Sequence, residues 1–348
     1  MFNLYFFFTM KHITIKDIAK YLSVSVSTVS RALADDKNIR KETKEQILAA
    51  AEELGYMRNP VAINLKSGRT NTVGVIVPEM DTPFFARIID GVQNVLYKKG
   101  LKVIIAQSNE NPEREKENLR LMESFMVDGI IVGICHRDMN RDEFKRLKDK
   151  GVPLVFYDRI PTFDFEVSKV VADDYIKTFF LVEHLIRKGK KHIAHIKAPD
   201  YMQSSSVRFK AYKDVLAKFK IPYNEDLVIK SPGMHFDDGI KAMKQLLDKN
   251  IPIDALHTYT DIIAIGAMSH LKSEKIHIPN DIAVVGFSGT LLSEMVYPPL
   301  TTVDLPLFEI GETAAELILE KIKNPAMEER TIVLDAKMRL RESTEGVR

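Results

Sequence analysis

The 348-residue chain has no tryptophan and a single cysteine, Cys135. One cysteine cannot form an internal disulfide, which predicts a reducing compartment and argues against a disulfide-stabilised secreted fold. The apolar start MFNLYFFFTM is too short to span a bilayer and lacks the basic flank and cleavage site of a signal peptide. We therefore predict a cytoplasmic protein with no membrane partner. Because Cys135 lies next to an apolar run, we interpret it as a buried, inert thiol.

Several motifs of enzymes and cofactor-binding proteins are also missing. The turn VPEMDTPFF has no glycine cradle for a dinucleotide, and neither GxxxxGK[ST] nor HExxH occurs. The stretch Gly286–Thr290 lacks the second glycine of a nucleophile elbow. The acidic pairs Asp173-Asp174 and Asp237-Asp238 fit helix N-termini, where carboxylates are favourable for dipole reasons alone. We predict no catalytic residues, no metal site and no cofactor, and therefore no enzyme.

The charge is nearly balanced overall and uneven along the chain. The net charge is +2, whereas residues 11–70 carry 11 Lys and Arg against 7 Asp and Glu, a local net charge of +4. A basic N-terminal region on a slightly acidic remainder fits attraction to phosphates. Four charges are also compatible with an ordinary solvated surface.

The basic region opens with a pair of short helices. The stretch TIKDIAKYLSVSVSTVSRALA, from Thr14 to Ala34, spaces its apolar residues three to five apart, which predicts two helices sharing one small core. Ser25 can cap the second helix, whose first turns are small and polar. Such a surface suits a recognition helix in a DNA major groove. The alternative is an ordinary helical hairpin with a polar second helix.

A third helix and a linker follow this pair. Residues 41–54 predict a helix with Ile47, Leu48, Ala51 and Leu54 on one face, ended by Gly55. Pro60 suits the first turn of one more short helix, VAINLKS, before the linker SGRTN. A helix this short would be marginal alone and could fold on binding.

From Thr72 onwards, short apolar runs alternate with amphipathic helices, as in VGVIVP, LKVIIAQ and DGIIVG. This pattern predicts parallel sheets covered on both faces by helices. The irregular stretch 160–166 divides the strands into two groups of four or five. Two doubly wound subdomains would place a ligand cleft at the carboxyl ends of both sheets.

Several motifs occur together in a characteristic order. They are TIKDIAKYLSVSVSTVSRAL, EELGYMRNPVAINLKSGRTNTVGVIVP, DGIIVG, PLVFYDR, EHLIRKGKKHIAHI, IPNDIAVVGFS, PPLTTVDLP and RLREST. With them the chain resembles the LacI/GalR family of bacterial transcription regulators over about residues 11–344. The resemblance implies an N-terminal all-α helix-turn-helix domain and an α/β core like that of periplasmic binding proteins. It also implies a cytoplasmic homodimer, repression of transcription, and control by a sugar or sugar derivative.

The resemblance implies these domains: an N-terminal extension at 1–10, with Met10 as an alternative start; a DNA-binding domain at 11–57; a hinge helix and linker at 58–71; and an effector-binding and dimerisation core at 72–348. Within the core we expect subdomain one at 72–161 plus 303–326. Subdomain two is expected at 162–300 plus 327–341.

The family's DNA-contacting positions match a set of residues in the head and hinge. Arg31 would pair with a guanine or contact a phosphate, Val26 would touch a thymine methyl, and Leu65 would enter the minor groove or pack the hinge onto the core. A double-stranded, near-palindromic operator is the implied partner. The full set is Thr14, Ser25, Val26, Ser27, Thr28, Ser30, Arg31, Asn59 and Leu65.

The resemblance implies effector contacts at Phe84, Asp158, Arg208, Phe236, Thr260 and Ser288. Each has a structural alternative, such as Phe84 in the core or Arg208 in a helix-surface ion pair. The chain departs from the family at Thr260, where Asn is frequent, and at Ser288-Gly289, where Asp-Asp is frequent. We therefore expect an effector different from the commonest sugars. A sugar-binding receptor of the periplasmic type is the alternative function, and the basic helical head argues against it.

Overall fold

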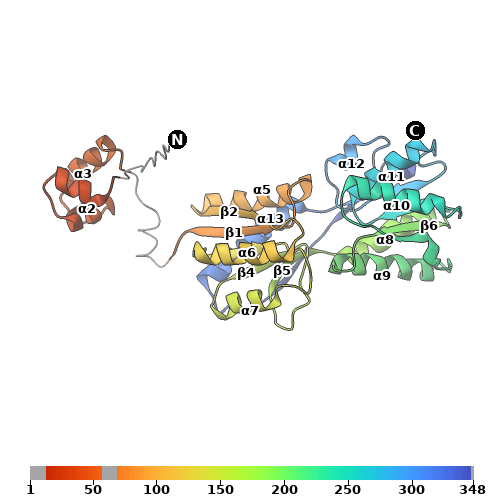
Figure 1. Ribbon diagram of the computed structural model, residues 1–348, viewed down its shortest axis with the longest axis horizontal. Helices are drawn as coiled ribbons and strands as arrows, with labels where there is room; N and C mark the ends of the chain where they lie inside the picture. Colours follow the sequence, from red (N-terminus) through yellow and green to blue (C-terminus); the bar gives the residue numbers. More distant parts are fainter. Residues whose placement is uncertain (1–12, 57–68, 346–348) are drawn as a thin grey trace, which may run out of the picture. The chain divides into compact units, whose positions relative to one another are not determined.

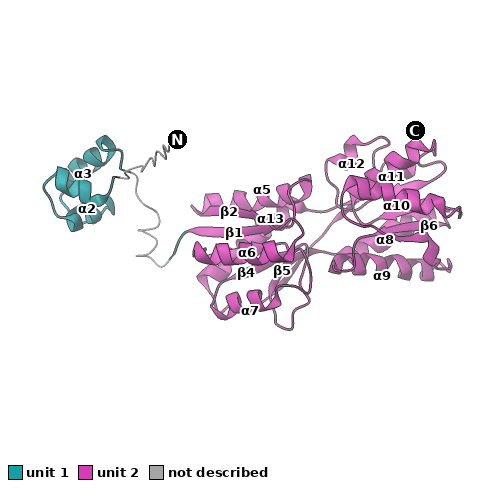
Figure 2. Ribbon diagram, in the orientation of Figure 1, with its two compact units in different colours: residues 1–70 teal, residues 71–348 magenta. Residues whose placement is uncertain are grey.

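The protein is described here by a computed structural model covering residues 13–56 and 69–345. It divides into two compact units, residues 1–70 and 71–348 (Figure 2). The predicted contacts Asn59 and Leu65, almost all of the predicted hinge at 58–71, and the N-terminal extension lie outside the described residues. No helix in the described ranges is long and apolar enough to cross a membrane.

The first unit is a three-helix head, as predicted. Its helices are α1 (Ile15–Tyr21), α2 (Val26–Leu33) and α3 (Lys41–Glu53). Ile18, Val29 and Ile47, one from each helix, are fully buried in a shared core. Gly55 ends the third helix with a left-handed φ of 66°, a conformation that glycine adopts without strain. Leu48 is 53% exposed, so its predicted place on the buried face of α3 was wrong.

The first sheet of the core contains six parallel strands in the order β11-β5-β4-β3-β1-β2 (Figure 1). The strands are β1 (Thr72–Val77), β2 (Lys102–Gln107), β3 (Gly129–Val132), β4 (Leu154–Tyr157), β5 (Ser168–Ala172) and β11 (Thr331–Leu334). Its helices are α5 (Pro83–Lys98), α6 (Pro112–Ser124), α7 (Arg141–Asp149) and α13 (Leu307–Lys323). Along β1, Val73, Val75 and Val77 pack in the α5 and α13 layer, whereas Ile76 packs in the α6 and α7 layer. The continuous apolar strand therefore reflects burial on both faces.

The second sheet is smaller and follows the same plan. Its four parallel strands, in the order β7-β6-β8-β9, are β6 (Ile193–Lys197), β7 (Val228–Lys230), β8 (Ala255–Thr258) and β9 (Ala283–Val285). One face contacts α8 (Asp174–Arg187) and α9 (Gln203–Lys218), and the other contacts α10 (Phe236–Asp248) and α11 (Asp261–Ser273). The short elements η1 (Glu225–Leu227), α12 (Leu292–Met295) and α14 (Glu342–Glu345) complete this half.

The chain crosses between the two halves later than the sequence suggested. β5 and β11 pair with each other and belong to the first sheet, so the boundary expected at 161/162 is too early, and Thr331–Leu334 does not belong to subdomain two. The irregular stretch 160–166 is a loop within subdomain one, because β4 and β5, on either side of it, are neighbours in the sheet. Two further crossing segments, β10 (Thr302–Asp304) and β12 (Lys337–Arg339), form an antiparallel pair.

Both halves contain helix pairs in backbone contact. A Cβ added at Gly91 in α5 would lie 2.1 Å from the carbonyl oxygen of Phe308, just inside α13. In the second half, a Cβ at Gly266 in α11 would lie 2.0 Å from the carbonyl oxygen of Phe236 in α10. Only glycine permits so close an approach, and any side chain would force the helices apart.

Two histidines are stacked inside the second half. His195 in β6 and His257 in β8 are register partners, and both are fully buried, with ring centroids 4.7 Å apart. His195 Nδ1 lies 3.2 Å from the carbonyl oxygen of His257, and the other three ring nitrogens have no hydrogen-bond partner among the described residues. Burial lowers the pKa of His195 to about 3 and lowers that of His257 well below its ordinary value.

This pair makes acid destabilising. Both histidines have lower pKa values in the folded state than in the unfolded chain. Between pH 6.5 and about 3 the unfolded chain therefore binds more protons, so the free energy of unfolding decreases as the pH is lowered. His195 contributes a loss of roughly 2 kcal/mol between pH 7 and pH 5, and His257 acts in the same direction. We expect His257→Phe to reduce this pH dependence in urea unfolding followed by circular dichroism. The exposed control His192→Phe should leave it unchanged, and a parent-like slope in His257→Phe would contradict the prediction.

Candidate functional site

The first candidate site is the exposed face of α2 in the head. Ser25 begins the helix, because its Oγ accepts a hydrogen bond from the Thr28 N–H at 3.0 Å and lies 2.7 Å from the hydroxyls of both Ser27 and Thr28. Val29 and Ala32 point into the head core, which leaves the opposite face to solvent. The side chains on that face are small and polar, and Ser25 caps the N-terminus of the helix.

Arg31 is the cation on this face. The residues Val26, Ser27 and Arg31 are exposed, and Val26 is 39% exposed despite being apolar. The Arg31 side chain forms no hydrogen bond or ion pair with another described residue, so its guanidinium fork is available to a partner outside the chain. Ser30 and Thr28 are partly buried beside it. The arrangement can present donors and a methyl surface to base edges.

Thr14 has a structural role at the start of α1. Its N–H and hydroxyl donate to the Asp17 carboxylate at 2.8 and 2.7 Å, which makes a capping box with Asp in the Glu position. Thr14 and Ser25 therefore both hold helix N-termini. Any contact they make with a phosphate would come from these fixed positions.

The second candidate site is a cavity between the two halves of the core. It is narrow, with about 70 Å³ available to the centres of water molecules. Five of the six predicted effector contacts line it, and they come from the carboxyl ends of strands in both sheets and from the helices beside them: Phe84, Asp158, Arg208, Thr260 and Ser288. Phe236, the first residue of α10, is not among the lining residues.

Arg208 holds the floor of this cavity together. Its Nη1 donates to the Tyr259 carbonyl at 2.6 Å, and its Nη2 donates to Asp174 at 2.8 Å. The guanidinium also lies over the Phe287 ring, with 3.6 Å from its central carbon to the ring centroid. The side chain is 5% exposed. Arg208 thus connects the ends of β8 and β9 to the start of α8, and the alternative of a helix-surface ion pair is wrong.

Asp158 and Ser288 line the cavity from strained backbone positions. Their φ values are 57° and 137°, in a region that residues with side chains rarely adopt. Burial raises the pKa of Asp158 to about 6, Arg159 opposes the shift, and Asp174 adds to it. Asp158 thus provides a carboxyl group, and Ser288 a hydroxyl, at the carboxyl ends of β4 and β9.

Asp261 fixes the loop that carries Ser288. Its carboxylate accepts from the N–H groups of Gly289 and Thr290 at 2.8 and 3.1 Å and from the Thr302 hydroxyl at 2.6 Å. Burial raises the pKa of Asp261 to about 6, while these hydrogen bonds oppose the shift. The sequence reasoning missed this residue. A carboxylate at the first position of α11 looks like an ordinary helix-terminal acid until the loop is placed beside it.

Thr260 presents an unused hydroxyl. It begins α11, yet its Oγ1 is buried, forms no hydrogen bond with another described residue, and belongs to a side chain that lines the cavity. A buried hydroxyl without a partner costs stability, so a ligand that supplied the missing bond would gain affinity. Glu79, Thr82, Tyr259 and Leu292 also line the cavity and were not predicted.

Two further contacts join the halves beside the cavity. The His136 ring, from the loop after β3, stacks on Tyr201, from the loop after β6, with centroids 4.9 Å apart. The Arg137 N–H donates to the Tyr201 carbonyl at 3.3 Å. Cys135 next to them is buried, as predicted, and burial raises the pKa of its thiol. The two halves of the core thus also contact each other directly through these two loops.

Comparisons with known proteins match both the head and the core of the chain. The family of "Periplasmic binding proteins and sugar binding domain of LacI family" matches residues 70–344, and "Bacterial regulatory proteins, lacI family" matches residues 14–59. Catabolite control protein A of Priestia megaterium is 30% identical over 96% of this chain and 99% of its own. The NTD biosynthesis operon regulator NtdR of Bacillus subtilis is 31% identical over 95% and 99%. Among solved structures, a complex of the transcriptional regulator CelR with cellobiose has a TM-score of 0.72 at 29% identity, over 95% of this chain and 100% of its own.

The ion pair between Arg208 and Asp174 generates a stability prediction. Arg208→Met would leave the Asp174 carboxylate without its cation, at a cost of about 3 kcal/mol in the free energy of unfolding. The double variant Arg208→Met/Asp174→Asn should recover most of that loss. Urea unfolding measures both values. Lys210→Met is the matched control, since it breaks an exposed pair with Asp214 on the same helix and should cost under about 1 kcal/mol. A double variant as unstable as the single one would contradict this account.

Proposed function

Because this chain belongs to the LacI family of bacterial regulatory proteins, we propose that it regulates transcription from a near-palindromic operator, with an effector bound in the core cavity. One observation carries the proposal: a helix-turn-helix head, with an exposed Arg31 on α2 that pairs with no other described residue, shares a chain with a cavity lined by five expected effector contacts. A sugar-binding receptor would leave the exposed face of α2 without a purpose.

The effector belongs to the class of sugars or sugar derivatives. Phe84 offers a ring face, Arg208 and Asp158 offer hydrogen bonds to hydroxyl or charged groups, and Thr260 and Ser288 offer hydroxyls. The replacement of the frequent acidic pair by Ser288-Gly289 removes acceptors at one end of the cavity, which disfavours effectors that need them. Effector binding would change the angle between the halves, and the dimer would transmit that change to the DNA.

A homodimer is supported by an apolar surface on the second half of the core. Leu291, Met295 and Tyr297 are 63%, 72% and 74% exposed and lie within seven residues of each other. Exposed apolar clusters of this kind mark interaction surfaces. A two-fold dimer would present two α2 helices to two operator half-sites. The protein would act in the cytoplasm, where the DNA lies, without catalysing a reaction.

Selection of binding sites from a random DNA pool tests the DNA function. We expect the full chain to enrich a near-palindromic site at physiological salt, and no enrichment over bulk DNA would contradict the proposal. Arg31→Ala should weaken operator binding by about 1–3 kcal/mol and relax the preference at one base of each half-site. Arg31→Lys is the matched control: it keeps the charge and loses the fork, so it should retain attraction to phosphates and lose the same base preference. An unchanged preference in both variants would exclude base reading by Arg31.

A thermal-shift screen of sugars and phosphosugars tests the cavity. Thr260→Val removes the unpartnered hydroxyl while keeping the side-chain shape, so a bound effector would lose about tenfold in affinity, with no cost to the unliganded protein. Thr178→Val is the matched control, because Thr178 Oγ1 is also buried without a described partner but does not line the cavity. Equal loss in both variants, or none in Thr260→Val, would remove Thr260 from the site.

A further inference from the structure

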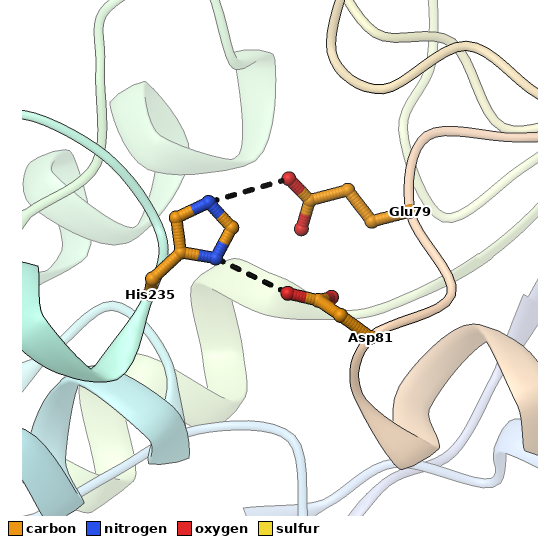
Figure 3. Close-up of side chains that lie close together, drawn as sticks. All are labelled: Glu79, Asp81 and His235. Atoms are coloured by element: carbon orange, nitrogen blue, oxygen red, sulfur yellow. Dashed lines mark ion pairs between the residues drawn. The ribbon is translucent and has the colours of Figure 1, made fainter.

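Three metal-ligating side chains from the two halves of the core meet at the edge of the cavity. Glu79 and Asp81 lie in the loop between β1 and α5, and His235 immediately precedes α10 (Figure 3). His235 Nδ1 lies 3.2 Å from an Asp81 oxygen, and His235 Nε2 lies 3.7 Å from a Glu79 oxygen. One ligand atom from each residue falls within a group no wider than 4.8 Å. Glu79 also lines the cavity.

This group carries more negative than positive charge. Arg159, which lines the same cavity, is engaged with Glu110 through two hydrogen bonds of 2.6 and 2.8 Å. Burial raises the pKa of Glu79 to about 7, with further contributions from Glu110 and Asp81, while His235 and Arg159 oppose the shift. Two carboxylates facing one imidazole therefore favour an additional positive charge between them.

We propose that Glu79, Asp81 and His235 bind a divalent first-row transition ion, with Zn²⁺ or Mn²⁺ as the fitting class, that bridges the two halves of the core. One imidazole nitrogen and two carboxylate oxygens form a mixed ligand set that suits these ions, whereas Mg²⁺ and Ca²⁺ favour oxygen ligands alone. Each ring nitrogen now faces one carboxylate, so one carboxylate would swing toward the metal-bound nitrogen, and the other nitrogen would keep a hydrogen bond that orients the imidazole.

The geometry requires only a small contraction. Ligand atoms around a tetrahedral zinc ion lie about 3.3 Å apart, compared with a present spread of up to 4.8 Å. The side chains of Asp81 and His235 are 51% and 56% exposed, so both can rotate without disturbing a packed core. Glu79, at 16%, is the fixed member of the set.

A bound ion would hold the cavity shut. Glu79 and Asp81 belong to one half and His235 to the other, so coordination by all three would oppose separation of the halves. Three protein ligands leave at least one coordination position open, as in sites where a metal also binds a small molecule. Since Glu79 lines the cavity, a hydroxyl or carboxylate of a bound effector could reach that position. Metal binding by the unliganded core does not depend on the DNA or effector function.

Isothermal titration with Zn²⁺ tests the site on the full chain after dialysis against a chelator, with no DNA or effector present. We expect one tight site per protomer and a rise in melting temperature on binding. Glu79→Gln and Asp81→Asn should each weaken this site by about tenfold or more, and His235→Asn should do the same. Titration with Mg²⁺ should show no tight site.

The matched control is His277→Asn. His277 is an exposed histidine whose Nδ1 lies 3.1 Å from Asp281, and the cluster of three ligating residues does not include it. Its variant should bind Zn²⁺ like the parent. The His235 backbone N–H donates to the Asp238 carboxylate, and the His235 side chain takes part in the same capping box at the start of α10, so His235→Asn also alters the cap of that helix. Glu79→Gln, in the other half, avoids this complication.

Three outcomes would overturn the proposal. The first is parent-like Zn²⁺ binding in Glu79→Gln and Asp81→Asn, which would place the ion elsewhere. The second is loss of the tight site in His277→Asn. The third is no tight site in the parent at all, in which case the three side chains form only a proton-dependent ion-pair cluster. The proposal is supported if Glu79→Gln and Asp81→Asn lose the tight Zn²⁺ site while His277→Asn keeps it.

Discussion

The buried guanidinium of Arg208 is the interaction on which the cavity depends. Arg208 extends from α9 and donates to Asp174, the first residue of α8. This helix begins where the chain first enters the second half of the core. Its guanidinium also lies over the ring faces of Phe287 and Tyr259, at the ends of β9 and β8. One charge, satisfied by one carboxylate and one carbonyl, therefore fixes the crossing point and two strand ends at once. Burying that charge is costly unless every partner stays in place, so the cavity floor must be rigid.

The walls above that floor are arranged differently. Asp158 and Ser288 occupy left-handed backbone positions, and Asp261 ties down the loop of Ser288 through two backbone N–H groups. The Thr260 hydroxyl forms no hydrogen bond within the described part of the chain. Strain and an unused hydrogen-bonding group are both costs that the unliganded protein carries. Effector binding can recover part of that cost, which links the affinity for a ligand to the shape of the cavity.

Sequence reasoning predicted local elements well and long-range pairing less well. The head, the capping by Thr14 and Ser25, and the alternating strands and helices follow from periodicity and turn residues over short stretches. The sheet membership of β5 and β11 could not be read in this way, because their pairing joins segments far apart in the chain. The family resemblance, which does not depend on local pattern, correctly placed five residues around the cavity. It placed Phe236 there wrongly, and it did not indicate the roles of Asp261 and Glu79.

The helix pairs in backbone contact have a consequence for how such a protein diversifies. At Gly91 and Gly266 there is no room for a single added carbon, so α5 and α13, like α10 and α11, cannot slide over each other or be repacked gradually. Some lining residues, such as Asp158 and Ser288, lie instead in loops after the ends of strands and carry little of this packing. Substitutions can therefore accumulate around the cavity while the two blocks stay unchanged. A lineage built on this frame can acquire a new ligand and keep the same moving parts.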